Sequence, residues 1–305
     1  MAAVVIHEVG LRDGLQMEKT LVPFERKLEW IRALVAAGLD IVQVGSFVHT
    51  TKVPQMADTD RLFQTLRAEA LRPGVALSGL VLNEKGMERA QAAGVDMLCM
   101  GVSASETHSR RNTGMSIAEA SDRIIAMAKE AIAAKLRVQV SVQSAFGCGY
   151  EGLVPAERVL GLVLQYADNG ITHVSLADTA GHAVPDQVSR MYEAVQRVGQ
   201  GIDCACHFHD TYGLGLANVW AAMQAGVTHV ETSVAGLGGC PFTRIAGGNV
   251  CTEDFVHMLQ RMGRRMDVQL GGLIAVANEV AAFFGREMPG MVHRTGAIAL
   301  TGAPA

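Results

Sequence analysis

The sequence predicts an α/β fold in which eight parallel strands close into a barrel, the (β/α)8 or TIM barrel, with additional helices at the C-terminal end. Short runs of β-branched residues alternate with longer helical patterns along the chain, the runs number eight, and no Pro/Gly/Ser-rich linker interrupts them. Residues 1–305 are therefore expected to form one barrel domain. The alternative is a doubly wound open sheet, but no GxGxxG follows the first run to support a dinucleotide fold.

The expected strands are short, rich in Val, Ile and other apolar residues, and bounded by turn residues. In chain order they are 4–8, 41–47, 75–82, 97–104, 138–146, 173–179, 203–210 and 229–236. Between them, apolar residues recur at intervals of three and four, which indicates helices with one buried face. These helices are expected at 23–37, 54–70, 84–93, 116–134, 155–169, 184–198 and 213–225, and two more at 250–262 and 272–285 complete the outer ring.

A glycine closes several of these helices immediately before the next strand. Gly38, Gly94, Gly170 and Gly226 each follow a helical pattern and precede an apolar residue. Glycine adopts the left-handed conformation that ends a helix without a steric penalty. The repeated turn therefore supports a regular succession of helix and strand.

Composition excludes several classes of partner. A chain of 305 residues that is 49% hydrophobic can bury a large core, and a net charge of −4 gives no basic stripe for nucleic acid or an anionic membrane. The N-terminus has no secretory pattern and no run is long enough to span a membrane, so a cytoplasmic protein is expected. Six cysteines without paired CxxC spacing indicate reduced thiols. The expected partner is a small molecule.

Polar residues follow the expected strands at the end where barrel enzymes carry their chemistry. Asp13 follows the first strand, Ser46 ends the second, Ser175 lies on the sixth, and a glycine-rich loop at 236–249 follows the eighth. These segments are far apart in the sequence. Closure of the barrel would bring them to one mouth.

The strongest chemical signal is the pair His207 and His209, because alternate residues of a strand point to the same face. Two imidazoles with the carboxylate of Asp13 suit a divalent cation, and Asn249 can add an amide oxygen. A chance pair containing one structural histidine is the alternative for the pattern alone. The nearby carboxylate on another strand end favours the metal site.

Two further residues suggest catalysis near this metal. Arg12 adjoins Asp13, and a cation in this position stabilises a developing enolate or oxyanion. Cys240 lies in a loop with five glycines, which is expected to close over a substrate and to bring in a thiol as acid or base. A surface ion pair and an inert loop cysteine are the simpler explanations of each residue alone.

Five segments of the chain together resemble the 3-hydroxy-3-methylglutaryl-CoA lyases, barrel metalloenzymes related to the isopropylmalate and homocitrate synthases. The resemblance covers almost the whole chain and is carried by VGLRDGLQMEK at 9–19, GSFVHTTKVPQMAD at 45–58, LADTAG at 176–181, CHFHDTYGLGLAN at 206–218 and SVAGLGGCPFTRIAGGNVCTED at 233–254. The GLGGCP loop favours the lyases over the synthases, as does the lack of a C-terminal regulatory domain.

The resemblance implies a role for each matching residue. Asp13, His207, His209 and Asn249 would bind Mg²⁺ or Mn²⁺, and Arg12 would stabilise the enolate of the departing acetyl-CoA. Cys240 would assist proton transfer. Further substrate contacts would come from Ser46 and Ser175, near the acyl carboxylate or the metal, and from Lys19, at the CoA phosphates. A homodimer is also expected.

The implied reaction is cleavage of a carbon–carbon bond in an acyl-CoA, with 3-hydroxy-3-methylglutaryl-CoA giving acetyl-CoA and acetoacetate. One position departs from the family, which usually has a glutamate where this chain has Gln43. The neutral side chain, together with His49, favours the alternative of a related substrate such as citramalyl-CoA, giving acetyl-CoA and pyruvate. A third reading is a non-catalytic relative that binds acyl-CoA. The joint presence of the acid, the metal ligands and the cation argues against it, namely Arg12, Asp13, His207, His209, Cys240 and Asn249.

Overall fold

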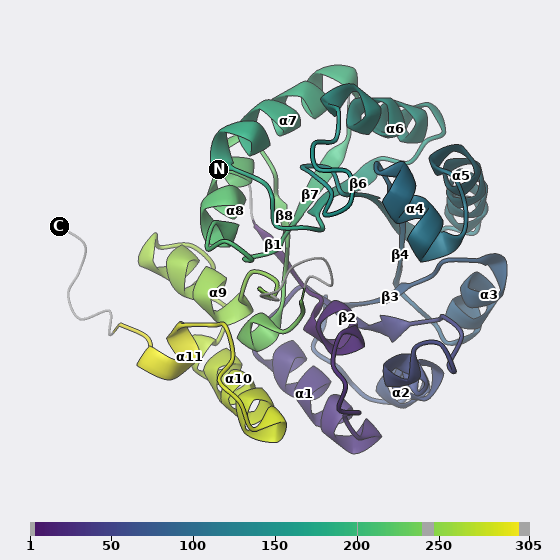
Figure 1. Cartoon of the computed structure of the whole chain (residues 1–305). Coiled ribbons are helices and arrows are strands. Elements are labelled where there is room, and N and C mark those ends of the chain that lie inside the picture. The colour runs from purple at the N-terminus through teal and green to yellow at the C-terminus, as the bar shows by residue number, and fades with distance from the viewer. Residues whose placement is uncertain (1–3, 200, 240–246, 299–305) are drawn as a thin grey trace.

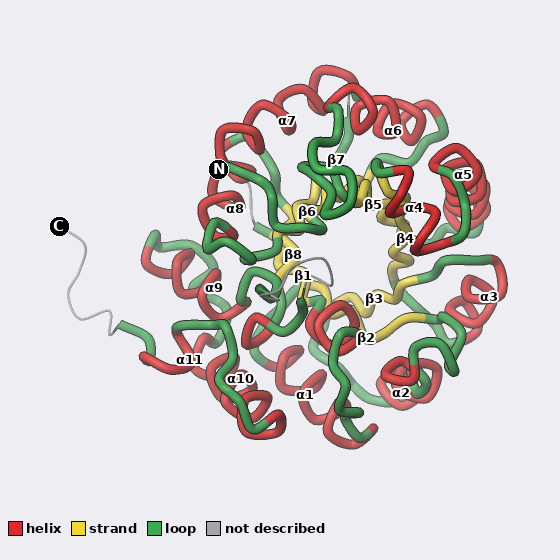
Figure 2. Tube along the Cα trace, in the orientation of Figure 1, coloured by secondary structure: helices red, strands yellow, loops and turns green. Residues whose placement is uncertain are grey.

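Eight parallel strands close into a barrel in a computed structural model that describes residues 4–199, 201–239 and 247–298. The strands are paired in chain order, and the last pairs with the first through Val5 and His229. Their bounds are β1 Val5–Glu8, β2 Ile41–Ser46, β3 Ala76–Leu80, β4 Met97–Ser103, β5 Arg137–Gln143, β6 His173–Asp178, β7 Asp203–Phe208 and β8 His229–Thr232. Figure 2 shows the strands as a closed ring inside the helices. The predicted barrel is confirmed, and the open sheet is excluded.

The helices form the outer layer and lie largely where the 3.6-residue pattern predicts them (Figure 1). Their bounds are α1 Phe24–Ala36, α2 Thr59–Arg67, α3 Glu84–Ala92, α4 Glu106–Thr113, α5 Ile117–Ala133, α6 Ala156–Asp168, α7 Pro185–Val198, α8 Gly215–Gln224, α9 Thr252–Arg261, α10 Leu270–Phe284 and α11 Val292–Thr295. The four predicted turn glycines all have positive φ, between 76° and 101°. None of the helices in the described ranges is long and apolar enough to cross a membrane.

Some elements differ from the sequence prediction for local reasons. The segment predicted as one helix at 54–70 is a 3₁₀ turn, Pro54–Met56, followed by α2. The short helices α4 and α11 were not predicted, because α4 is almost entirely polar and α11 has only four residues. The predicted strand at 229–236 ends at Thr232, because Val234–Gly236 forms a 3₁₀ turn in which Ala235 adopts a left-handed conformation with φ 58°.

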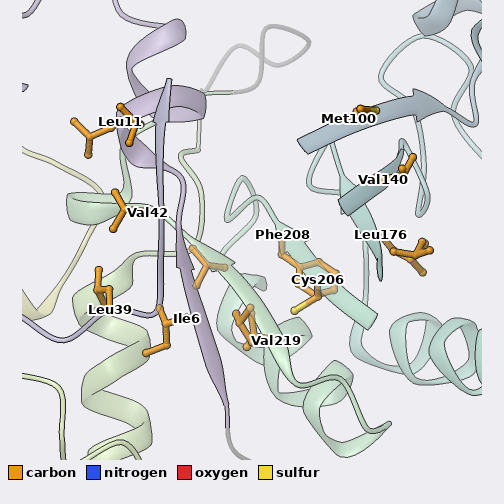
Figure 3. Packing of buried hydrophobic residues seen from close by; sticks show 14 of the residues in the cluster. Ile6, Leu11, Leu39, Val42, Met100, Val140, Leu176, Cys206, Phe208 and Val219 are labelled. Carbon is orange, nitrogen blue, oxygen red and sulfur yellow. The ribbon is translucent and has the colours of Figure 1, made fainter. Parts of the chain in front are cut away.

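Buried apolar side chains lie on both sides of the strands, outside the barrel and within it. Alternate strand residues such as Ile6, Val42 and Leu176 point outward and pack in one large apolar cluster against the helices (Figure 3). A smaller cluster inside the barrel contains Ile41 and Met97. Other buried side chains inside the barrel are polar, among them Gln139, Ser175 and Glu231. These polar groups lie below the mouth where the strands end.

The C-terminal helices complete the outer ring as predicted. α10 packs against both α9 and α1. Trp30 of α1 contacts Phe283 edge to face at 5.7 Å between ring centroids, and its indole nitrogen donates to Glu279 at 3.2 Å. The last helices therefore cover the seam where β8 meets β1.

Candidate active site

Three side chains gather at the mouth of the barrel where the strands end. Asp13 lies in a π-helical turn, Gly10–Gly14, directly after β1, and His207 lies on β7. β7 ends at Phe208, so His209 lies one residue past the strand and is bridged to Asn249. The Nε2 atoms of His207 and His209 are 3.8 and 3.9 Å from Oδ2 of Asp13. The three residues form a group that is able to hold a metal ion.

Asn249 adds a fourth side chain to this group. Its amide nitrogen donates to Oδ2 of Asp13 at 2.9 Å and to the Leu237 carbonyl at 3.2 Å. Its Oδ1 is buried and has no hydrogen-bond partner among the described residues, and the same is true of Nδ1 of His209. A buried oxygen without a partner costs free energy, and an ion would satisfy it. The donor set therefore fits a divalent cation.

Glu231 of β8 orients His207 from below. Its Oε2 lies 2.9 Å from Nδ1 of His207, which leaves Nε2 directed at Asp13. Its Oε1 accepts hydrogen bonds from Ser175 at 2.8 Å and from Gln139 at 2.5 Å. A carboxylate behind a metal-binding histidine fixes its tautomer and increases its basicity. Glu231 is not among the residues predicted from the sequence, although a carboxylate inside an apolar strand is a usable signal.

The pKa values of the histidines fit this arrangement. Burial would lower the pKa of His207, but the hydrogen bond and charge of Glu231 and the charge of Asp13 outweigh it and raise the value. Burial, together with the neighbouring His207, lowers the pKa of His209 to about 4. His209 is therefore neutral near pH 7, as a metal ligand must be.

Arg12 forms hydrogen bonds to both Asp13 and Gln43 of β2. Its Nη1 donates to Oδ1 of Asp13 at 2.6 Å, and its Nε donates to Oε1 of Gln43. Burial opposes ionisation of Asp13, but the charge of Arg12 and of the two histidines holds its pKa well below the usual range. Asp13 is consequently an anion at neutral pH, which suits a ligand and makes it a weak base.

The loops after β1 and β8 approach each other too closely for ordinary side chains. A Cβ on Gly14 would lie 2.6 Å from Cβ of Leu237. Glu8 reinforces the contact, because its Oε1 accepts from the backbone nitrogens of Gly10 at 2.7 Å and Val234 at 2.9 Å, and its Oε2 accepts from Thr252 at 2.5 Å. These bonds hold Asp13 beside the loop that leads to Asn249.

The other predicted site residues lie in different surroundings. Ser46 is fully buried at the end of β2, and its hydroxyl has no partner among the residues described. Ser175 is also fully buried and donates to Glu231, so it supports His207 from inside the barrel. Lys19 is exposed and lines a pocket of about 610 Å³ together with Arg286 and the glycines at 236 and 238–239. Cys240 lies outside the described residues.

The chain matches known proteins of one family over most of its length. Residues 3–280 match the family model described as HMGL-like. The chain is 37% identical over 286 residues to a hydroxymethylglutaryl-CoA lyase of Bacillus subtilis, covering 94% of this chain and 95% of that one. It is also 37% identical over 279 residues to a 3-hydroxy-3-isohexenylglutaryl-CoA/hydroxymethylglutaryl-CoA lyase of Pseudomonas aeruginosa, covering 92% of each chain.

Solved structures agree with this result. The structure of the Bacillus subtilis HMG-CoA lyase superposes with a TM-score of 0.91 at 36% identity and covers 96% of this chain and 97% of that one. An HMG-CoA lyase from Acinetobacter baumannii, solved in complex with coenzyme A and 3-methylmalate, gives a TM-score of 0.90 at 34% identity and covers 99% and 98% of the two chains. This chain is therefore similar to these lyases in both sequence and fold.

Proposed function

This chain belongs to the HMGL-like family and is a carbon–carbon lyase that acts on an acyl-CoA, and we propose that its substrate is 3-hydroxy-3-methylglutaryl-CoA. The products are acetyl-CoA and acetoacetate. The observation that supports the proposal most is the meeting of Asp13, His207, His209 and Asn249 around one point, with Arg12 beside them. A site of this kind holds a cation and offers a second positive charge to the substrate.

The four ligand residues would hold Mg²⁺ or Mn²⁺. When bound, such a cation supplies a Lewis acid that lowers the pKa of the substrate's 3-hydroxyl and fixes its position. Asp13 contributes a permanent negative charge, and His209 is neutral and ready to donate a lone pair. Glu231 holds His207 in the tautomer that presents Nε2 to the site.

Cleavage begins when the 3-hydroxyl gives its proton to water at the mouth of the barrel. As the oxygen then forms a carbonyl with C3, the C2–C3 bond breaks, and its electron pair moves to C2 and the thioester carbonyl as an enolate. Arg12 is a fixed cation and is assigned to stabilise this charge, while Gln43 and Asp13 hold the guanidinium in place. A proton added at C2 completes acetyl-CoA, and we assign this donation to Cys240.

We assign the CoA phosphates to the pocket lined by Lys19 and Arg286. Both side chains are exposed, and Arg286 is paired with Glu18 at 2.5 Å. Their cationic groups suit phosphate oxygens. The pocket is also lined by Gly238 and Gly239, which directly precede Cys240 in the sequence. A homodimer and a cytoplasmic location stay predictions, which light scattering and cell fractionation test.

Gln43 favours one second candidate substrate. It accepts a hydrogen bond from Arg12 without neutralising its charge, so the guanidinium has only the carboxylate of Asp13 among the acids it contacts in the described ranges. A more positive site suits an acyl group whose carboxylate lies directly on the reacting C3 atom, such as that of citramalyl-CoA, which would give acetyl-CoA and pyruvate.

The deciding experiment is a measurement of acetyl-CoA release from 3-hydroxy-3-methylglutaryl-CoA and from both enantiomers of citramalyl-CoA, with Mg²⁺, with Mn²⁺ and with excess EDTA. Cleavage of the first substrate that EDTA abolishes supports the proposal. Preference for citramalyl-CoA replaces the proposed substrate and keeps the chemistry. Cleavage that persists in EDTA, or in His209→Ala, would reject the metal site.

A further inference from the structure

The opposite end of the barrel interior holds a second group of metal-ligating side chains. His173, Asp203 and His229 are the first residues of β6, β7 and β8. One ligand atom from each lies within 4.8 Å of the others. Because Asp203 precedes His207 by four residues on the same strand, this group is separate from the one around Asp13.

Both histidines point into the barrel. Ser175 and Glu231 form a hydrogen bond inside it, and each lies two residues after one of the histidines on the same strand. Alternate residues of a strand share a face. Interior layers of such barrels are usually filled by branched apolar side chains. The interior of this barrel departs from that rule at several levels, and at this end its polar side chains are of the kinds that bind metals.

The three side chains lie close enough together for one ion to contact all of them. Nδ1 of His229 lies 3.2 Å from Oδ1 of Asp203, and the rings of His173 and His229 are 4.7 Å apart between centroids. In a tetrahedral zinc site with bonds of about 2.0–2.2 Å, neighbouring ligand atoms lie about 3.3–3.6 Å apart. The contact between His229 and Asp203 is close to this spacing, and the three ligand atoms all lie within 4.8 Å of one another.

One polar atom of these three residues has no hydrogen-bond partner among the described residues. Nε2 of His173 is buried and makes no hydrogen bond within the described residues. The hydroxyl of Thr228 donates to Oδ1 of Asp203 at 3.2 Å and lies 3.0 Å from Nδ1 of His229, so it holds these two side chains beside each other. Asp203 is half exposed, so the group is open to solvent on one side. An ion has access from there.

We propose that His173, Asp203 and His229 bind a divalent transition-metal ion of the Zn²⁺ type at the N-terminal end of the barrel. Two imidazoles and one carboxylate, without the amide oxygen that Asn249 adds at the mouth, favour such an ion over Mg²⁺ or Ca²⁺, and water completes its coordination. The ion joins the starts of three neighbouring strands, so its role is structural. The proposal does not depend on the proposed reaction.

The test measures how much zinc the 305-residue chain binds. Chelator-stripped protein is equilibrated with ZnCl₂ and separated from free metal, and zinc per chain is measured by mass spectrometry. We expect two ions in the wild type, one in His229→Asn, one in His173→Gln and one in His207→Ala, which removes the upper site. The control His257→Asn, on the surface side of α9, keeps two.

A second readout excludes loss by misfolding. In His207→Ala, Zn²⁺ should raise Tm by about 5 °C, because only the lower site is left to bind it. Adding His229→Asn to this variant should abolish the shift while circular dichroism stays unchanged. Equal zinc content in the wild type, His229→Asn and His173→Gln, or an undiminished Tm shift in the double variant, overturns the proposal.

Discussion

At the scale of single residues, the site depends on how charges are balanced around Arg12. The guanidinium bonds one carboxylate, Asp13, and one neutral amide, Gln43. Replacing the amide by a carboxylate adds a counter-charge without changing the size of the side chain. The local positive potential, which acts on substrate and enolate together, then falls.

Gln43→Glu should therefore change substrate preference more than stability. We expect the ratio of kcat/KM values for 3-hydroxy-3-methylglutaryl-CoA and citramalyl-CoA to change at least about tenfold, equal to about 1.4 kcal/mol, with Tm within about 2 °C of the wild type. Gln91→Glu, an exposed position on α3, adds the same charge far from the mouth and is the control. An unchanged ratio would show that position 43 does not select the acyl group.

Glu8 makes stability depend on pH in an unusual direction for an acid. Burial raises its pKa from 4.5 to about 7, against the hydrogen bonds it accepts. Because the folded value lies above the unfolded one, the folded protein retains the proton between about pH 4.5 and pH 7. The free energy of unfolding therefore falls across this window, by about 3 kcal/mol at about 1.4 kcal/mol per pH unit.

Glu8→Gln removes this titration and keeps the shape of the side chain. Its amide oxygen can accept from Gly10 and Val234, and its nitrogen can donate to Thr252. We expect the variant to gain about 3 kcal/mol relative to the wild type between about pH 4.5 and about pH 8. Denaturant unfolding at both pH values measures the free energy of unfolding of each protein. An equal change of this free energy with pH in Glu8→Gln and in the wild type would contradict the prediction.

The sequence identified most of the residues at the mouth but not the ones behind them. Asp13 and the two histidines were predictable because the pleat and the strand ends fix where they meet. Glu231 was not, because its role depends on the register between β7 and β8, where His207 is opposite Glu231. Register follows from closure of the whole barrel, which a local pattern does not contain.

At the scale of elements, the strand positions were predictable and their ends were not. Alternating apolar runs locate all eight strands, but β8 stops at Thr232, four residues before the predicted end. The backbone then turns through Ala235, whose nitrogen donates to Glu253 at 3.1 Å. A carboxylate from the following helix thus decides where the strand ends. Such a long-range contact leaves no mark on the strand's own pattern.

The contact between the loop after β8 and the segment before α9 allows no side chain at one position. A Cβ on Gly248 would lie 1.7 Å from the carbonyl oxygen of Gly236. Gly248→Ala should therefore push the two backbones apart and displace Asn249. We expect at least a 100-fold loss of kcat/KM, about 2.7 kcal/mol, in a protein that still folds.

Gly271→Ala is the matched control for this substitution. Gly271 lies on α10, and a Cβ there meets nothing within 4 Å. The control should retain activity and gain about 0.5–1 kcal/mol of stability, because alanine favours a helix. Full activity in Gly248→Ala would mean that Asn249 does not need its present position.

At the scale of the whole molecule, one side chain joins segments from both ends of the chain. Arg265, in the turn between α9 and α10, donates to the Val4 carbonyl at 2.7 Å and to Asp40 at 2.5 Å. Asp40 in turn accepts from the backbone nitrogen of Ile6 at 2.8 Å. The Arg265 side chain is 11% exposed, so these bonds are largely shielded from water. It stabilises the closure of the barrel from below.

Arg265→Met should lower the free energy of unfolding by about 2–4 kcal/mol, because Asp40 and the Val4 carbonyl lose a charged donor. Thermal unfolding should show a Tm lower by about 5–10 °C, with kcat at 25 °C unchanged in the folded fraction. Arg190→Met removes an exposed pair with Asp186 and should have almost no effect. Equal effects of the two substitutions would count against the role of Arg265.

Glu231 also limits how this barrel can be redesigned. Its two oxygens bind side chains from three other strands: Gln139 of β5, Ser175 of β6 and His207 of β7. A mutant library that enlarges the acyl pocket by varying Ser175 also alters the carboxylate that orients a metal ligand. Substitutions at these four positions will therefore show epistasis, and new specificities will evolve more readily from side chains on the surrounding loops.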